Sequence, residues 1–175
     1  MVRAFVSVGS NIDPENNVRA ALRLLGESAA VRAISTVYLT EPIGPTRQPP
    51  YYNCVIEIET GLSPLDLKYR LLRRVEASLG RVRTADRYAP RTIDLDLILY
   101  NDAVLTSDEL ILPDPDILVR PFLATGLREL APGLVLPGSG VSIESVAARL
   151  SNETLKPLEH YTEQIRKEIR HDRTK

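Results

Sequence analysis

The chain has 175 residues, which is enough for one domain with a sizeable core and too few for two ordinary domains. It is 43% hydrophobic and 26% charged, which is typical of a globular protein and excludes the disordered and fibrous classes. Its formal net charge of −1 gives no overall attraction to nucleic acid or to a membrane surface.

The cysteine and histidine content and the hydropathy of the sequence limit the cellular compartment and the type of catalysis that we expect. The single cysteine, Cys54, excludes an internal disulfide framework and favours a reducing compartment. No apolar stretch approaches 18 residues, and Arg3–Val8 alternates like a strand instead of opening a signal peptide. We therefore expect a cytoplasmic protein with no membrane partner. Both histidines, His160 and His171, lie in the polar C-terminal part, which argues against a histidine general base.

Period-two alternation and helical spacing divide the first half of the chain into strands and helices. In chain order we predict a strand over Val2–Val8, a helix from Pro14 to near Gly26 with Asp13 as N-cap, a strand over Val31–Thr40, a proline-rich loop over Glu41–Pro50, a strand over Tyr51–Thr60, and a helix from Ser63 and Pro64 to Gly80. The second helix buries a stripe of leucine and valine residues, and glycine is a suitable residue for its C-terminal end.

The second half begins with a polar, non-periodic loop and the clearest strand of the chain. We predict this loop over Arg81–Pro90, the strand over Arg91–Tyr100, short segments at 103–105 and 109–112, and helices over about 121–130 and 143–150. Residues 1–150 are predicted to form a single domain, and 151–175 a polar C-terminal tail. Helical spacing of apolar residues in the tail predicts a terminal helix that packs on the domain or on a partner.

The order strand–helix–strand–strand–helix–strand predicts an α+β fold. It is the split βαβ arrangement of a ferredoxin-like α-β sandwich, in which helices pack on one face of an antiparallel sheet.

Two aspartates stand out on the strand before Tyr100. If Ile93, Leu95, Leu97 and Leu99 point into the core, Asp94 and Asp96 project together from the other face. Carboxylates at i and i+2 stand roughly 6.5 Å apart along a strand, which suits two oxygen-ligated magnesium ions on one polyphosphate. The alternative for this pattern alone is a solvent-facing pair on a half-exposed sheet.

Basic residues near the aspartates favour a phosphate ligand. Arg91 precedes the strand, and Arg81, Arg83 and Arg87 lie in the loop before it. Guanidinium groups bind phosphate oxygens bidentately, and carboxylates with a metal beside arginines are what phosphoryl transfer requires. The sequence contains neither G-x-x-x-x-G-K-[ST] nor G-x-G-x-x-G, so we expect side chains to hold any nucleotide.

Several separated blocks resemble one family. The segments Gly80-Arg81-Val82-Arg83 and 89–97 (APRTIDLDL) are similar to the signature of the 6-hydroxymethyl-7,8-dihydropterin pyrophosphokinases of folate synthesis. The resemblance extends over most of the chain, through the blocks VGSN at 8–11, YLTEPIG at 38–44, YYN at 51–53, and Leu112-Pro113 through Arg120 and Phe122.

The resemblance implies transfer of the β,γ-pyrophosphoryl group of ATP to the hydroxymethyl oxygen of a reduced pterin, with release of AMP. It implies that Asp94 and Asp96 ligate two Mg²⁺ ions and that Arg81 and Arg91 steady charge during transfer. The implied ATP-binding residues are Glu76, Arg83, Arg91, Leu97, Asp114 and Arg120. The implied pterin-binding residues are Thr40, Pro42, Ile43, Gly44, Tyr51, Asn53 and Phe122.

The residue types agree with these roles. A pterin has an amide-like edge and a flat π face, so Asn53 can hydrogen-bond the edge while Tyr51 and Phe122 flank the ring. The alternative is that these two aromatic residues belong to the core. The two loops would close on both substrates and exclude water, which is a competing acceptor.

Two positions depart from the family pattern. Asp114 stands where the family usually has a histidine, and an ionised carboxylate would repel phosphate, so we expect an active enzyme with an altered ATP site. Tyr88 stands where the family often has a tryptophan, which keeps an aromatic residue in the loop.

Other interpretations stay open. Asp114 motivates a catalytically impaired relative that acts as a nucleotide- and pterin-binding module. The basic stretch from Lys68 to Arg91 motivates nucleic-acid binding, against which the near-zero net charge argues. The same chemistry on a different acceptor alcohol is a further alternative. We expect small-molecule partners only, and a monomer or weak homodimer.

Overall fold

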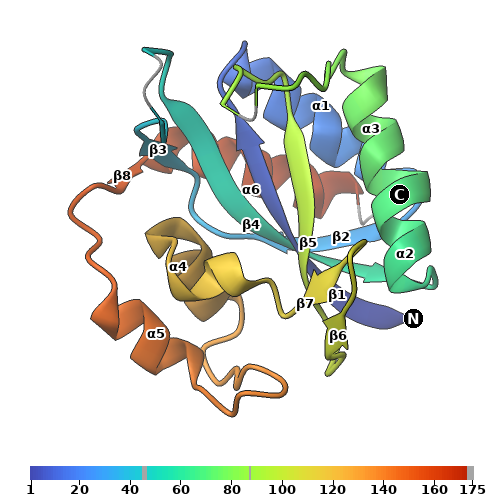
Figure 1. Cartoon of the computed structure of the whole chain (residues 1–175). Helices are drawn as coiled ribbons and strands as arrows, with labels where there is room; N and C mark the ends of the chain where they lie inside the picture. Colours follow the sequence, from blue (N-terminus) through green and yellow to red (C-terminus); the bar gives the residue numbers. More distant parts are fainter. Residues whose placement is uncertain (45–46, 87, 173–175) are drawn as a thin grey trace.

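The computed structural model describes residues 1–44, 47–86 and 88–172. Its centre is a six-stranded sheet in which β5, β1, β4, β3 and β8 are neighbours in that order and β2 also pairs with β4 (Figure 1). Every pairing is antiparallel. The strands are β1 Val2–Ser10, β2 Ala30–Ile34, β3 Tyr38–Thr40, β4 Tyr51–Thr60, β5 Asp94–Tyr100 and β8 Lys156–Pro157, and a separate two-stranded sheet joins β6 Leu105–Thr106 to β7 Ile111–Leu112.

Helices cover both faces of the sheet, so the prediction of a single covered face was wrong. The helices are α1 Pro14–Gly26, α2 Pro64–Asp66, a π-helical segment Leu67–Leu72, α3 Arg73–Ser78, a 3₁₀ segment Pro115–Leu118, α4 Pro121–Leu130, α5 Ile143–Arg149 and α6 Glu159–Asp172. One core packs α1, the α2–α3 helix and α6 against the sheet, and a second core packs α4 and α5 against the other face. Val55 and Ile98 point to that second face, and their apolar side chains require a cover.

The antiparallel α+β prediction is confirmed, and most elements lie where the sequence patterns place them. The predicted strand over Val31–Thr40 is divided, because Ser35–Val37 leaves the ladder between β2 and β3. There the Ser35 hydroxyl accepts a hydrogen bond from Val55 N at 3.0 Å, and Thr36 N donates to Glu129 at 2.7 Å. These bonds satisfy backbone groups by side chains instead of by a neighbouring strand.

Two local predictions were wrong. Asp13 does not cap α1 with its side chain, because its backbone lies at φ 41° and its carboxylate instead accepts hydrogen bonds from Asn16. Leu99 does not share a face with Leu95 and Leu97. A β-bulge shifts the β1–β5 register opposite Ile98, so Leu99 enters the second core.

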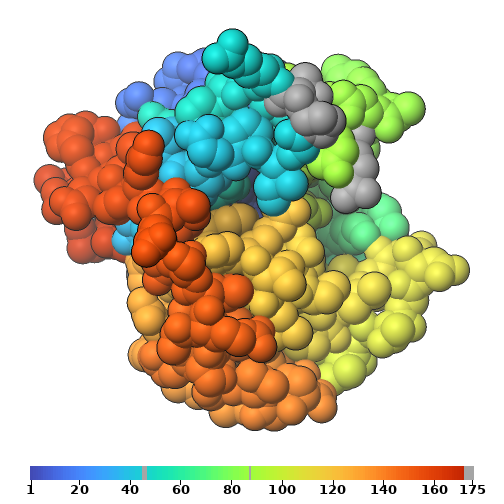
Figure 2. Space-filling model, turned by 60° about the vertical axis from the view of Figure 1, so that its left-hand side comes forward, coloured from blue at the N-terminus to red at the C-terminus, as the bar shows by residue number. Residues whose placement is uncertain are grey.

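The C-terminal tail runs across the surface to the cyan segments from the first part of the chain, as Figure 2 shows in orange to red. Strand β8 pairs with β3, and α6 then packs on the first core through Tyr161 and Ile165, which are 7% and 1% exposed. Within the described residues, no helix is long and apolar enough to cross a bilayer.

Candidate active site

A cleft of about 490 Å³ lies over the part of the second sheet face that α4 leaves uncovered. Its walls come from β1, β4, β5, the segment after β3 and the 3₁₀ turn that leads into α4. Ten of the predicted site residues line it: Thr40, Ile43, Tyr51, Asn53, Arg91, Asp94, Asp96, Asp114, Arg120 and Phe122. The fold therefore brings together residues that lie up to 82 positions apart in the sequence.

Strand register places the polar residues of the cleft floor. Gly9 of β1 stands opposite Asn53 of β4 on one side and Asp94 of β5 on the other, and Ser7 stands opposite Asp96. Directly opposed residues share a face, so Asn53 and Asp94 rise on either side of a residue without a side chain. At about 4.8 Å per strand spacing, their backbones are about 10 Å apart.

Two arginines hold Asp94. Arg91 forms an ion pair and hydrogen bond with one carboxylate oxygen, and Arg81 Nη2 lies 3.6 Å from the other. The nearby Asp94 carboxylate raises the pKa of Arg91 against the lowering effect of burial. The Nε of Arg81 is buried and has no acceptor among the described residues. A buried guanidinium with a spare donor is suited to an anionic ligand.

The Asp96 carboxylate has weaker ion-pair contacts than the Asp94 carboxylate. Arg73 Nη2 lies 3.9 Å from its carboxylate, and its side chain is 49% exposed toward the cleft. The surrounding protein limits its hydration, and with repulsion from Asp94 this raises its pKa to about 6. Two carboxylates that disfavour each other's charge, on one face of one strand, fit a site for hard cations.

Glu76 lies beneath the acidic pair and does not line the cleft. It is 1% exposed, and its carboxylate accepts hydrogen bonds at 2.8 Å from Arg73, Arg83 and the backbone N–H of Leu95. Burial raises its pKa to about 7, while the bond from Leu95 N and the charge of Arg73 oppose the rise. The predicted direct contact with ATP therefore does not fit its position. Its carboxylate connects Arg83 to the backbone between the two aspartates.

Leu97, predicted to bind ATP, does not line the cleft with its side chain. Its side chain is 3% exposed and belongs to the first core, on the sheet face opposite the cleft. Arg87, predicted to join the arginine cluster, lies outside the described residues.

The other end of the cleft can form hydrogen bonds with the polar edge of a flat ligand. Asn53 Nδ2 donates a hydrogen bond of 2.6 Å to Thr40 Oγ1, which fixes the plane of its amide. Tyr51 lies beside it, and burial raises the pKa of its phenol. Phe122 at the start of α4 is 7% exposed and contributes to both the second core and the cleft wall, so its place in the core does not remove it from the cleft.

The segment after β3 approaches the second loop. Ile43 is 63% exposed at the cleft mouth, whereas its neighbours Pro42 and Gly44 do not line the cleft. Gly44 has φ 118°, and a Cβ there would lie 2.6 Å from the Tyr88 ring. A residue with a side chain at position 44 would therefore displace Tyr88, which lines the cleft.

Asp114 has a structural role that the sequence did not reveal. Its carboxylate accepts a hydrogen bond of 2.8 Å from Asp116 N and so caps the 3₁₀ segment. Burial raises the pKa of Asp114, and the bond from Asp116 N opposes the rise. Arg120 pairs with Asp116 at 2.7 Å, so both predicted nucleotide residues converge on one turn at the cleft edge.

Sequence reasoning missed Gln48, which links the two loops. Its amide N–H donates to Tyr88 O at 2.7 Å, and its oxygen accepts from buried Asn11 at 2.8 Å. Asn11 Oδ1 in turn accepts from Arg91 N at 2.7 Å. Thr154 from the tail also lines the cleft. No local pattern marks these residues, because each contributes through a contact distant in sequence.

Comparison with known proteins decides the family. Residues 5–132 match the family described as 7,8-dihydro-6-hydroxymethylpterin-pyrophosphokinase (HPPK). The chain belongs to the HPPK family. It is 36% identical over 159 residues to the 2-amino-4-hydroxy-6-hydroxymethyldihydropteridine pyrophosphokinase of Haemophilus influenzae, covering 89% of this chain and 98% of that one. It is 37% identical over 149 residues to the protein of the same description in Pseudomonas aeruginosa, covering 83% and 91%.

Solved structures support the HPPK fold. A Plasmodium falciparum HPPK-DHPS triple mutant superposes with a TM-score of 0.68 at 12% identity over 95% of this chain. The wild-type P. falciparum HPPK-DHPS gives 0.65 at 12% identity over 90% of this chain. The matched region is 46% and 47% of those longer chains.

Proposed function

We propose that this chain transfers the pyrophosphoryl group of ATP to the hydroxymethyl oxygen of 6-hydroxymethyl-7,8-dihydropterin in folate biosynthesis, releasing AMP. The observation that carries the proposal is one cleft whose lining has two carboxylates and Arg91 at one end and a fixed amide beside an aromatic ring at the other. Arg81 does not line the cleft itself but lies 3.6 Å from the Asp94 carboxylate. The backbone separation of about 10 Å between Asn53 and Asp94 leaves room for a bicyclic ring and its hydroxymethyl group between them.

Asp94 and Asp96 are the residues that would hold two Mg²⁺ ions. The described residues contain no group of three or more His, Cys, Asp or Glu that could hold a metal, so phosphate oxygens and water would complete the coordination. Bound magnesium supplies neutralisation of the triphosphate charge that opposes attack by an oxygen nucleophile.

Arg81 and Arg91 would bind oxygens of the pyrophosphoryl group, because they border the carboxylate pair and phosphate is a strong acceptor for guanidinium. Arg83 and Arg120 would contact the nucleotide from either side, and Asp114 would shape that side through its turn. Among the described residues the cleft lining contains no histidine, so the acceptor proton passes to water or phosphate.

The pterin would lie at the other end. Asn53, fixed by Thr40, would hydrogen-bond the pterin edge, and Tyr51 and Phe122 would flank the ring. Pro42, Ile43 and Gly44 would close over it with Tyr88. We further propose that the protein acts in the cytoplasm as a monomer or weak homodimer with small-molecule partners only.

Product analysis tests the proposal. The protein is incubated with ATP, magnesium and 6-hydroxymethyl-7,8-dihydropterin, and AMP and ADP are separated by chromatography. Pterin-dependent AMP is the expected result. ADP would mean transfer of a single phosphate and contradict the proposal. Binding of both ligands without any AMP would favour the catalytically impaired relative, with Asp114→His as the first variant to make.

A further inference from the structure

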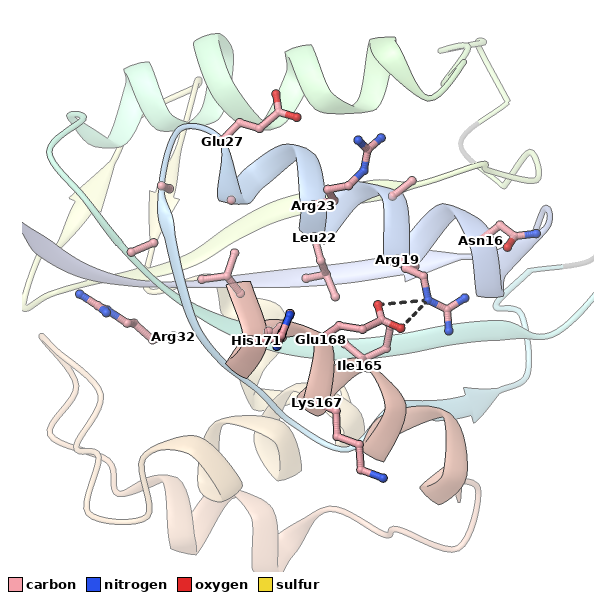
Figure 3. A pocket seen from close by; sticks show the side chains of 16 residues that line it. Asn16, Arg19, Leu22, Arg23, Glu27, Arg32, Ile165, Lys167, Glu168 and His171 are labelled. Carbon is pink, nitrogen blue, oxygen red and sulfur yellow. Dashed lines mark hydrogen bonds and ion pairs between the residues drawn. The ribbon is translucent and has the colours of Figure 1, made fainter. Parts of the chain in front are cut away.

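A second hollow, of about 1140 Å³, is lined by residues of the first core, on the opposite side of the sheet from the cleft. Figure 3 shows the side chains that line it. It lies between α1, β2 and the C-terminal half of α6, and we call it the distal groove. Leu22, Val31 and Ile165 form its floor, and all three belong to the first core. The family match ends at residue 132, so α6 and its wall of the groove lie beyond the matched segment.

Small residues create the space. Ala20 and Gly26 of α1, Ala29 just before β2 and Ala30 at its start line the groove where larger side chains would reduce its volume. A Cβ built at Gly26 meets no atom within 4 Å, and Gly26 has no positive φ that would require glycine. Neither packing nor backbone conformation therefore requires glycine at position 26. Its lack of a side chain leaves space in the groove.

The rim carries an excess of positive charge. Four basic and two acidic side chains line the groove, apart from His171. Arg19 is paired with Glu168 at 3.0 Å, and Arg32 is paired at 2.5 Å with a glutamate of β4. Arg23 and Lys167 have no hydrogen-bond or ion-pair partner among the described side chains. They extend from α1 and α6 at the two edges of the groove, and their charged ends point away from each other (Figure 3).

We propose that the distal groove binds a small organic anion with an apolar body, such as an aromatic carboxylate or sulfonate. The apolar floor would take the body, and the excess positive charge of the rim, to which Arg23 and Lys167 contribute, would attract the acidic group. The groove volume of about 1140 Å³ is slightly above the usual range of small-molecule sites, about 300–1,000 Å³, so a small ligand would fill only part of it. A second copy of this chain fits less well, because two such rims would face each other with the same sign of charge.

Binding of 8-anilinonaphthalene-1-sulfonate tests the site, because this probe has an aromatic body and an anionic group and fluoresces in apolar surroundings. Titrations are made with the cleft saturated by 6-hydroxymethyl-7,8-dihydropterin and α,β-methylene-ATP, so that the cleft cannot take up the probe. Gly26→Leu fills the groove and replaces a helix glycine, which favours folding. We expect it to weaken binding at least tenfold. Gly133→Leu is the matched control, since its added side chain also meets open space, and it should leave the affinity unchanged.

A charge variant gives an independent readout. Arg23→Gln with Lys167→Gln should weaken binding about fivefold at low salt and flatten its dependence on ionic strength. Arg128→Gln on α4, under the other sheet face, should do neither. Equal affinity of wild type and Gly26→Leu, or no probe binding once the cleft is saturated, would overturn the proposal.

Discussion

Gly9 lies on the cleft floor, where the neighbouring Asn53 side chain leaves no room for a Cβ atom. A Cβ at this position would lie 2.7 Å from Asn53 Oδ1, about 0.7 Å closer than the 3.4 Å at which ordinary contact begins. The backbone of Gly9 is extended within β1 and accepts alanine, so the strain falls on the neighbouring amide. In Gly9→Ala we therefore expect the Asn53 amide to rotate away and its 2.6 Å bond to Thr40 to break.

The size of the effect follows from that bond and from the substrate contact it prepares. A misdirected amide loses a hydrogen bond and leaves polar groups imperfectly paired, which costs about 1–3 kcal/mol. At about 1.4 kcal/mol per factor of ten, the KM for the pterin should rise about 5- to 140-fold. The nucleotide end is untouched, so the KM for ATP should change less than about twofold. The preference for alanine over glycine in a strand, about 0.5–1 kcal/mol, offsets part of the loss of the Asn53–Thr40 bond, so we expect a small decrease in the melting temperature.

The assay is steady-state AMP formation with each substrate varied in turn, together with thermal unfolding. Gly61→Ala is the control, because a Cβ there meets nothing within 4 Å. An unchanged pterin KM in Gly9→Ala would refute the assignment of Asn53 to the pterin edge. An equal rise in both KM values would mean that the variant disturbs the whole sheet.

Three further variants distinguish residues that take part in catalysis from residues that stabilise the structure around the site. Asp96→Ala should lower kcat at least about a thousandfold, since a lost metal ligand removes several kcal/mol, while thermal unfolding stays normal because this side chain is 49% exposed. Glu76→Ala removes the acceptor of the buried Leu95 N–H and of the Arg73 and Arg83 guanidinium groups, which are 25% and 51% exposed. It should lower the free energy of unfolding in urea by about 1–3 kcal/mol, unlike the exposed Glu144→Ala. Gln48→Ala removes the bond to Tyr88 and should lower kcat/KM about tenfold with little change in melting temperature; an unchanged kcat/KM would contradict the loop link.

Local patterns predicted the elements well wherever one interaction dominated. Helix α4 was predicted at its observed bounds, and β4 likewise, because an apolar period and flanking prolines mark each without a competitor. The division of the segment 31–40 could not be predicted, since it depends on a hydroxyl at Ser35 and a carboxylate at Glu129 that is 93 positions beyond Thr36.

In the candidate site, too, some residue positions could be predicted from local sequence patterns and others could not. Asp94 and Asp96 could be placed on one face because a strand has a period of two, and the register with β1 confirms that shared face. The position of Leu99 could not be foreseen, because a bulge is set by pairing with a partner strand and leaves no mark on the strand itself. The burial of Glu76 also has a long-range cause, since its main acceptor role is toward Leu95 N on another element.

The tail connects the two hollows of the molecule. Leu155 lines the cleft on one side of the sheet, and ten residues later Ile165 forms part of the floor of the distal groove on the other. Between them β8 pairs with β3, the strand that carries Thr40. A ligand in the distal groove that favours one position of α6 would therefore act on β3 through β8, and from there on the Thr40–Asn53 hydrogen bond. Such coupling requires the groove ligand to bind more tightly to one position of α6 than to another. The coupling free energy would be measured by comparing the affinity for the pterin with and without the groove ligand.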